Sequence, residues 1–83
     1  MGLDTVEFVL WAEKHFGMTI ADADAEKLET VGEFCRYVAE HSPLPRAYDE
    51  VFLVVKMHLH QEYSIPLAQI QERSAFVRDL GLD

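Results

Sequence analysis

The stretch TVGEFCRYVAEH, residues 30–41, decides the fold class of this chain of 83 residues. Thr30 and Glu33 form the T-x-x-E pattern of a capping box, in which each side chain accepts a hydrogen bond from the backbone N–H of the other residue. Four apolar residues follow at positions i, i+3, i+4 and i+7: Val31, Phe34, Cys35 and Val38. Because this spacing places them on one face of a helix, the stretch predicts an amphipathic helix with a buried side.

The segment before this stretch predicts a second amphipathic helix, over residues 3–16. Asp4 and Glu7 lie near its start, where the helix dipole favours negative charge. Gly17 is suited to end the helix. The apolar residues at helical spacing, which we expect to face the core, are Leu3, Val6, Val9, Leu10 and Phe16.

The rest of the chain also lacks the alternating pattern of β-strands. Asp22 or Asp24 can cap one or two helical turns over residues 25–28. SPLPR, residues 42–46, predicts an extended linker because two prolines in three residues oppose a helix. A long helix over residues 47–63 and a long loop complete the chain. The loop residues expected to reach the core are Ile70, Phe76 and Leu80. The fold class is therefore all-α, in one small domain.

The composition excludes several classes of function. The chain is 49% apolar and 27% charged, with a net charge of −8. That charge argues against nucleic acid and anionic membranes as partners, and in favour of either basic protein partners or plain solubility. The chain has no apolar run of about 18 residues that would span a membrane. A single cysteine, Cys35, favours a reducing cytoplasm, so we expect a cytoplasmic protein.

Residues 2–38 resemble, without a gap, the second half of the acyl carrier protein family. In that half a serine precedes L-D-[TS]-V-E, an amphipathic helix ends in E-x-x-F, and I-x-D-x-x-A-E-K leads to a T-V-x-x helix. The matching residues are Leu3-Asp4-Thr5-Val6-Glu7, Phe16, Ile20, Asp22, Ala25-Glu26-Lys27 and Thr30-Val31.

Residues 51–83 resemble the first half of the same family, an amphipathic helix and a long loop that ends in [AS]-x-F-x-x-D-L-G-x-D. The matching residues are Ser74, Phe76, Asp79-Leu80-Gly81 and Asp83. The resemblance implies an acyl-carrier-like four-helix bundle in permuted order, with the family's helices two, three and four before its helix one. Residues 1–83 would form this single domain: 1–41 resemble the second half, 42–46 are the linker, and 47–83 resemble the first half.

The family serine that accepts 4′-phosphopantetheine falls at the seam between the two halves. Asp83 would precede this serine and Leu3 would follow it, but Gly2 stands in its place. Because glycine has no hydroxyl to attack coenzyme A, we expect no cofactor and assign no cofactor-binding residue. Ser42, Ser64 and Ser74 lie at helix boundaries or in the loop and are not expected to replace it.

The residues favour neither an enzyme nor a metal site. His58 and His60 are about 200° apart on a helix, so they do not converge on one metal ion. His15 and His41 lie singly near helix ends, and Cys35 lies on an apolar stripe, which favours a small buried side chain over a nucleophile. No Ser-His-Asp or Cys-His arrangement has supporting spacing, so no catalytic residue is assigned.

The resemblance implies a docking role for the first helix, because the corresponding family helix presents acids to basic patches of partner enzymes. The residues assigned to docking are Asp4, Glu7, Trp11 and Glu13. A solvated acidic face is the other interpretation of these acids. Trp11 stands where the family has a small residue, and Ala12 where it has a leucine. Either the local core is repacked or Trp11 is exposed toward a partner.

The expected function is a non-enzymatic, acyl-carrier-like interaction or regulatory module, with basic patches on acyl- or thioester-handling enzymes as its partners. One alternative is a genuine carrier in fatty acid, polyketide or non-ribosomal peptide synthesis, with an altered or split attachment site for 4′-phosphopantetheine. The other is a domain-swapped dimeric scaffold. Its homodimer contact would use the apolar belt of Phe52, Leu53 and Val54.

Overall fold

Four α-helices form within residues 2–83, the part of the chain that the computed structural model describes; Met1, the first residue of the expected domain, lies outside it. They are α1 (Leu3–Phe16), α2 (Asp22–Ala25), α3 (Val31–His41) and α4 (Tyr48–Tyr63), followed by a 3₁₀ turn, η1 (Leu67–Gln69). The described residues contain no strand, only an isolated antiparallel bridge between Thr30 and Ala75. The all-α prediction is therefore confirmed.

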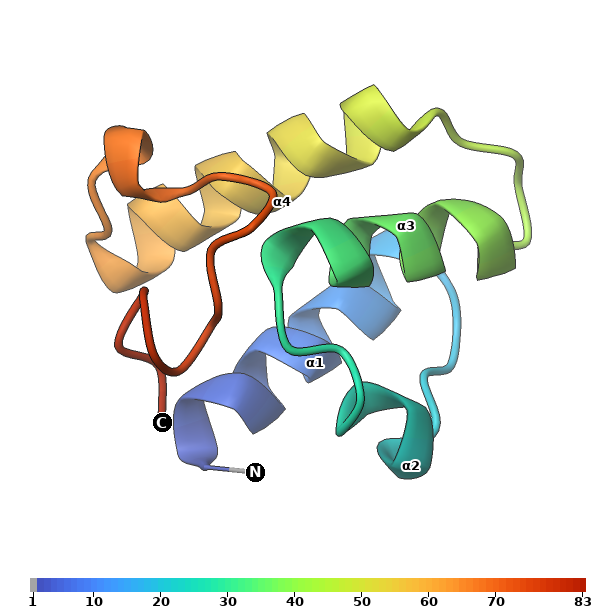
Figure 1. Cartoon of the computed structure of the whole chain (residues 1–83). Helices are drawn as coiled ribbons and strands as arrows, with labels where there is room; N and C mark the ends of the chain where they lie inside the picture. The colour runs from blue at the N-terminus through green and yellow to red at the C-terminus, as the bar shows by residue number, and fades with distance from the viewer. Residues whose placement is uncertain (1) are drawn as a thin grey trace.

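The helices pack around one core, with α3 beside α4 (Figure 1). After α4 the long loop turns back and ends beside the start of α1, so Asp83 lies next to Gly2 and Thr5 (Figure 1). The short helix was expected over residues 25–28, whereas α2 spans Asp22–Ala25. Asp22 and Asp24 lie inside α2, and Ala21 occupies the N-cap without a side-chain hydrogen bond. Gly17, with φ 64°, ends α1 as expected.

The N-terminus of α3 joins the two halves of the chain. The capping box forms as predicted: Thr30 Oγ1 accepts the Glu33 N–H at 3.2 Å, and Glu33 Oε1 accepts the Thr30 N–H at 3.0 Å. The next free N–H groups point to the C-terminal loop, where Gly32 N–H donates to Glu72 O at 2.8 Å. A Cβ at residue 32 would lie 2.9 Å from that oxygen, so this close approach requires glycine.

The buried face of α1 differs from the predicted stripe. Phe8, Ala12 and Phe16 are buried, whereas three residues of the expected stripe are exposed: Leu3, Val6 and Leu10. The ring of Phe8 packs on Phe34 and Phe76, with centroids 4.8 and 5.1 Å away. Apolar residues lie on more than one side of α1, so periodicity alone does not determine which side is buried. The aromatic contacts of Phe8 determine it.

Only some of the apolar side chains of α4 are buried in the core. Val51, Val55 and Leu59 are fully buried at i, i+4 and i+8. Of the proposed dimer contacts, Phe52 and Val54 are half-buried against the core, while Leu53 is 60% exposed. Dimerisation through this belt stays a prediction. Among the residues described, no helix combines the length and the apolar character needed to cross a bilayer.

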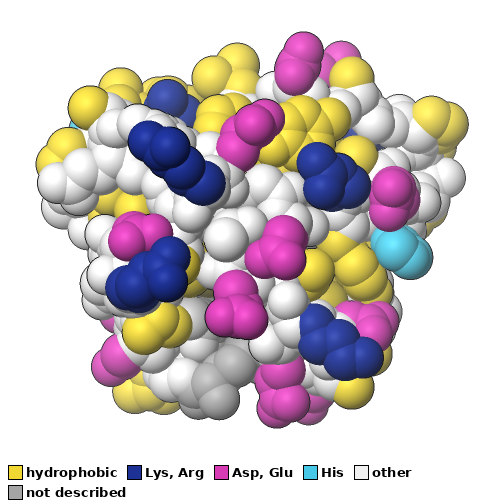
Figure 2. Space-filling model, viewed as in Figure 1, with side chains coloured by type: hydrophobic (Ala, Val, Ile, Leu, Met, Phe, Trp, Pro, Cys, Tyr) yellow, Lys and Arg dark blue, Asp and Glu magenta, His cyan; other side chains and the backbone are white. Residues whose placement is uncertain are grey.

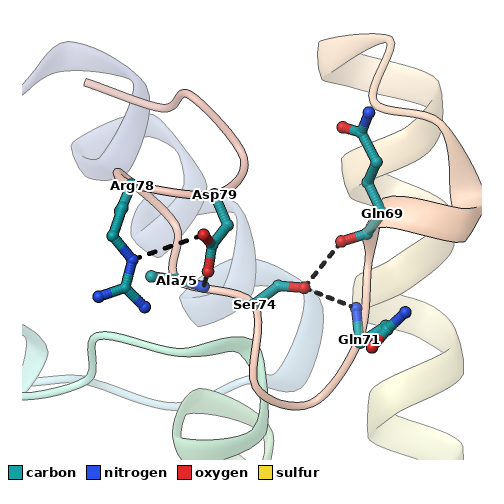
Figure 3. Close-up of polar contacts among 6 residues, drawn as sticks. All are labelled: Gln69, Gln71, Ser74, Ala75, Arg78 and Asp79. Carbon is teal, nitrogen blue, oxygen red and sulfur yellow. Dashed lines mark hydrogen bonds and ion pairs between the residues drawn. The ribbon is translucent and has the colours of Figure 1, made fainter.

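The C-terminal loop is fixed by buried apolar residues and by Ser74. Ile70, Phe76 and Leu80 are buried, as predicted. The buried Ser74 hydroxyl donates to Gln69 O at 2.7 Å and accepts the Gln71 N–H at 2.9 Å (Figure 3). These bonds hold the loop in the turn that places its carbonyl groups over α3.

A carboxylate closes the next turn of the loop. Asp79 Oδ2 accepts the Ala75 N–H at 2.8 Å, and Arg78 Nε lies 3.5 Å from Asp79 Oδ1 (Figure 3). The hydrogen bond from Ala75 is the main reason why the pKa of Asp79 is lowered from its ordinary value, and Arg78 contributes. The D-L-G motif thus builds a turn in this fold.

We expect Ser74→Ala to lower the free energy of unfolding by about 1–3 kcal/mol, because it leaves two loop groups without their buried partner. Urea denaturation measures this change. Ser64→Ala is the matched control: Ser64 is exposed, and the expected change is within about 0.5 kcal/mol. Equal stability of Ser74→Ala and the unmodified chain would contradict this role.

Candidate functional site

An open groove between α1 and α4 is the candidate site. Its α1 wall contains all four residues assigned to docking from the sequence: Asp4, Glu7, Trp11 and Glu13. The opposite wall comes from α4, which contributes His58, Glu62 and Tyr63. Sequence reasoning assigned none of these α4 residues to the site. They lie more than 40 positions away from the α1 wall, and no spacing signal connects the two segments.

The groove is acidic. Asp4, Glu7, Glu13 and Glu62 line it, against one basic side chain, Lys14. By contrast, acidic and basic side chains are interspersed on the face shown in Figure 2. The groove therefore offers a concentrated negative potential, which attracts cationic groups and speeds their encounter with the surface.

Tyr63 lies at the end of the groove near the start of α1. Its hydroxyl donates to the backbone oxygen of Asp4 at 3.3 Å, which joins α4 to α1. Burial raises the pKa of Tyr63, and the carboxylates of Glu7, Asp4 and Glu62 raise it further. The phenol therefore stays neutral at physiological pH and acts as a hydrogen-bonding group.

Trp11 lines the groove from α1. It is half-buried, and its ring stacks on the imidazole of His58 with centroids 3.7 Å apart and planes 5° apart. Ala12 is fully buried in the core. Thus the small residue packs inside, and the tryptophan lies in the groove, where its ring is stacked on His58 and also contacts His15.

Glu13 has a structural role besides lining the groove. Its Oε2 accepts the backbone N–H of Ile20 at 2.7 Å. This bond anchors the segment after α1 and lets Ile20 enter the core, where it is 3% exposed. Asp4 and Glu7 are consequently the better candidates for contacting a partner.

Next to the acids, α1 exposes the three apolar side chains that the sequence predicted to be buried. Leu3 is 78% exposed, Val6 37% and Leu10 55%. The spacing of three and four residues keeps them on one side of the helix. An exposed apolar stripe that is bordered by carboxylates is typical of an interaction surface.

The seam residues Gly2 and Asp83 are in contact. The backbone oxygen of Asp83 accepts the Thr5 N–H at 3.0 Å, and its carboxylate accepts the Asp4 N–H at 3.1 Å. Asp83 thus supplies the N-terminal cap of α1 that Gly2 cannot supply by a side chain. The closeness expected for the two seam residues is confirmed within one chain.

A small cavity of about 260 Å³ opens beside this seam. Its interior is largely apolar, with contributions from Phe8, Leu28, Phe34 and Phe76, and Gly2 is among the residues that line it. A flexible apolar group that was attached at the seam would have this cavity within reach.

The remaining cysteine and histidine candidates make contacts that stabilise the fold. Burial raises the pKa of the Cys35 thiol to about 12, with a further contribution from Glu72, so this thiol stays protonated. His60 Nδ1 lies 2.8 Å from Ile65 O, and His41 stacks on Tyr37 at 4.0 Å. Within residues 2–83, no group of three or more potential ligands converges on a metal position.

No protein-family model matches this chain, and no solved structure matches it. The resemblance to acyl carrier proteins therefore rests on the sequence motifs described above.

We expect Gly2→Ala to lower the free energy of unfolding by about 1 kcal/mol through loss of the α1 cap. Gly2 has φ −79°, so its backbone tolerates any residue. However, an added Cβ would overlap the backbone of Asp83 and displace it. Urea denaturation measures the stability, and amide exchange of Thr5 reports the cap directly.

The control for this prediction is Leu3→Ala. Leu3 is the exposed neighbour of Gly2, and its truncation should change neither measurement by more than about 0.5 kcal/mol. Unchanged stability and unchanged Thr5 exchange in Gly2→Ala would show that Asp83 is not the cap.

Proposed function

We propose that this chain is an acyl-carrier-like, non-enzymatic interaction module that docks through α1 on basic surfaces of enzymes that handle acyl groups or thioesters. The observation that carries the proposal is the α1 surface itself. Exposed Leu3, Val6 and Leu10 lie beside Asp4 and Glu7. A partner with apolar recesses surrounded by lysine or arginine would match this surface in both shape and charge.

The permuted arrangement of the acyl-carrier-like bundle belongs to this proposal. Two features support it. The long loop after α4 returns to the start of α1, so that Asp83 and Gly2 meet where the family serine would stand. In addition, the loop motif around Asp79 and the capped helix α3 are in contact through the loop carbonyl groups, which joins the two family-like halves into one core.

The absence of covalent chemistry is also part of the proposal. Gly2 lacks a hydroxyl, and the Ser74 hydroxyl is buried with both of its hydrogen bonds made inside the loop. Partner recognition would then depend on shape and charge alone. Such a module would occupy or regulate the docking sites of its partner enzymes.

The test of docking uses a purified ketosynthase with a basic entrance surface as the probe. We expect Glu7→Lys and Leu10→Arg each to weaken binding about tenfold, since each places a positive charge against a positive surface. Titration calorimetry at low salt measures the affinity, and higher salt should weaken binding by the unmodified chain.

Two matched controls lie outside the groove. Glu40→Lys on α3 and Leu44→Arg in the linker make the same chemical changes at exposed positions, and we expect them to leave the affinity within about twofold. If the control variants weaken binding as much as the groove variants, binding depends only on net charge and the α1 surface is not the docking site.

A second candidate function is a genuine carrier with an altered attachment site. The cavity beside Gly2 favours it, because a carried group that was attached at the seam would be shielded there. We nevertheless expect no attachment, since the seam has no hydroxyl.

Incubation with coenzyme A and a broad-specificity phosphopantetheinyl transferase, followed by intact-mass measurement, tests this alternative. We expect no mass increase for the unmodified chain and a gain of one arm for Gly2→Ser, with an ordinary carrier protein as positive control. A mass increase in the unmodified chain would establish the carrier function. Because an added Cβ at residue 2 displaces Asp83, amide exchange of Thr5 must show the α1 cap intact in Gly2→Ser; an unmodified variant with that cap would count against the assignment of Gly2 to the serine position.

A further inference from the structure

His58 holds an unusual position for an ionisable group in the proposed docking groove. It belongs to α4, but its ring lies against α1, stacked on Trp11 at 3.7 Å between centroids. Phe8 lies 6.1 Å from it and Tyr63 meets it edge-on at 6.0 Å. The imidazole therefore has three aromatic neighbours and lines the groove from α4.

The charged groups near His58 come from both helices that form the groove. The α4 neighbour is Glu62, and the α1 residues that line the groove or contact Trp11 are Asp4, Glu7, Glu13, Lys14 and His15. Burial lowers the pKa of His58 from its ordinary value of 6.5, and His15 lowers it further, while Glu62 raises it. The ring is thus mostly neutral at pH 7, and it takes up its proton at a lower pH than an ordinary histidine does.

The other histidines lack this arrangement. His41 lies on α3 and stacks on Tyr37, and His60 contacts the Ile65 oxygen. Neither of them lines the groove. His15 is exposed and contacts Trp11 at a longer distance, 5.2 Å between centroids. Among the histidines, His58 is the one that lines the groove, so its charge would appear there.

We propose that the groove between α1 and α4 is a pH-gated docking site, in which protonation of His58 against Trp11 releases a cationic protein partner. This inference rests on the proposed docking function and adds its regulation. With His58 neutral, the carboxylates face the partner unopposed except by Lys14. A proton on His58 adds a positive charge to the lining of the groove and repels the partner. By linkage, a bound cationic partner in turn disfavours that proton.

The magnitude follows from one unit charge a few ångströms from the partner. In a partly hydrated groove this repulsion corresponds to about a tenfold loss of affinity. Carboxylic acids ordinarily remain ionised down to pH 5.5, so the attractive side of the groove changes little over the same range.

The test measures binding of a synthetic amphipathic helical peptide of leucine and arginine at pH 7.5 and pH 5.5. For the unmodified chain we expect the affinity at pH 5.5 to be about threefold lower than at pH 7.5, because the tenfold loss requires His58 to be fully protonated. His58→Phe keeps a ring against Trp11 without a charge, and its affinity should change by less than about 1.5-fold. His58→Gln serves as the second uncharged variant in case the phenylalanine alters packing. His41→Gln is the matched control and should respond like the unmodified chain.

The fluorescence of Trp11, the sole tryptophan, gives a readout without any partner. A protonated imidazole quenches a stacked indole. We therefore expect the Trp11 emission of the unmodified chain and of His41→Gln to decrease at pH values below the range in which an ordinary histidine titrates. The emission of His58→Phe should not show this decrease. Absence of this transition overturns the inference. So does an equal pH response of binding in the unmodified chain and His58→Phe. Failure to bind the peptide at both pH values overturns the docking function itself, which the fluorescence titration does not measure.

Discussion

The N-terminus of α3 is the junction on which the rest of this fold depends. A helix begins with N–H groups that have no partner inside the helix, and burial makes leaving them unpaired costly. Here the Thr30 side chain of the capping box accepts the Glu33 N–H. The distant loop accepts the two N–H groups before it: Ser74 O accepts the Val31 N–H at 3.0 Å, and Glu72 O accepts the Gly32 N–H. Because these bonds fix the loop, Phe76 enters the core against Phe8 and the chain end reaches α1.

The C-terminal loop also supplies hydrogen-bond acceptors to the free N–H groups at the start of α1. Gly2 has no side chain to cap this helix, and Asp83 provides both a backbone oxygen and a carboxylate to its free N–H groups. The carboxylate at this position also complements the helix dipole. Both helix starts are thus stabilised by the C-terminal loop, which explains how a small domain with a modest core holds a long loop in one conformation.

Much of the fold was predictable from local patterns, and much of the site was not. The capping box, Gly17 and the prolines after His41 determined where α1, α3 and α4 begin or end, because caps and breakers act within a few residues. The α1 wall of the groove was also predictable, from its acids and Trp11. His58, Glu62 and Tyr63 were not, since their approach to α1 depends on how two distant helices pack.

The sequence by itself determined the helices, the excess of negative charge and the glycine at the seam, because each of these follows from residue identity and short-range spacing. Only the tertiary structure decided which side of α1 faces the core. With Leu3, Val6, Leu10 and Phe8 all apolar, the choice fell to the aromatic packing of Phe8 with Phe34 and Phe76, which left the other three exposed beside the acids. The stacking of His58 on Trp11 was decided in the same way, by contacts that no local pattern encodes.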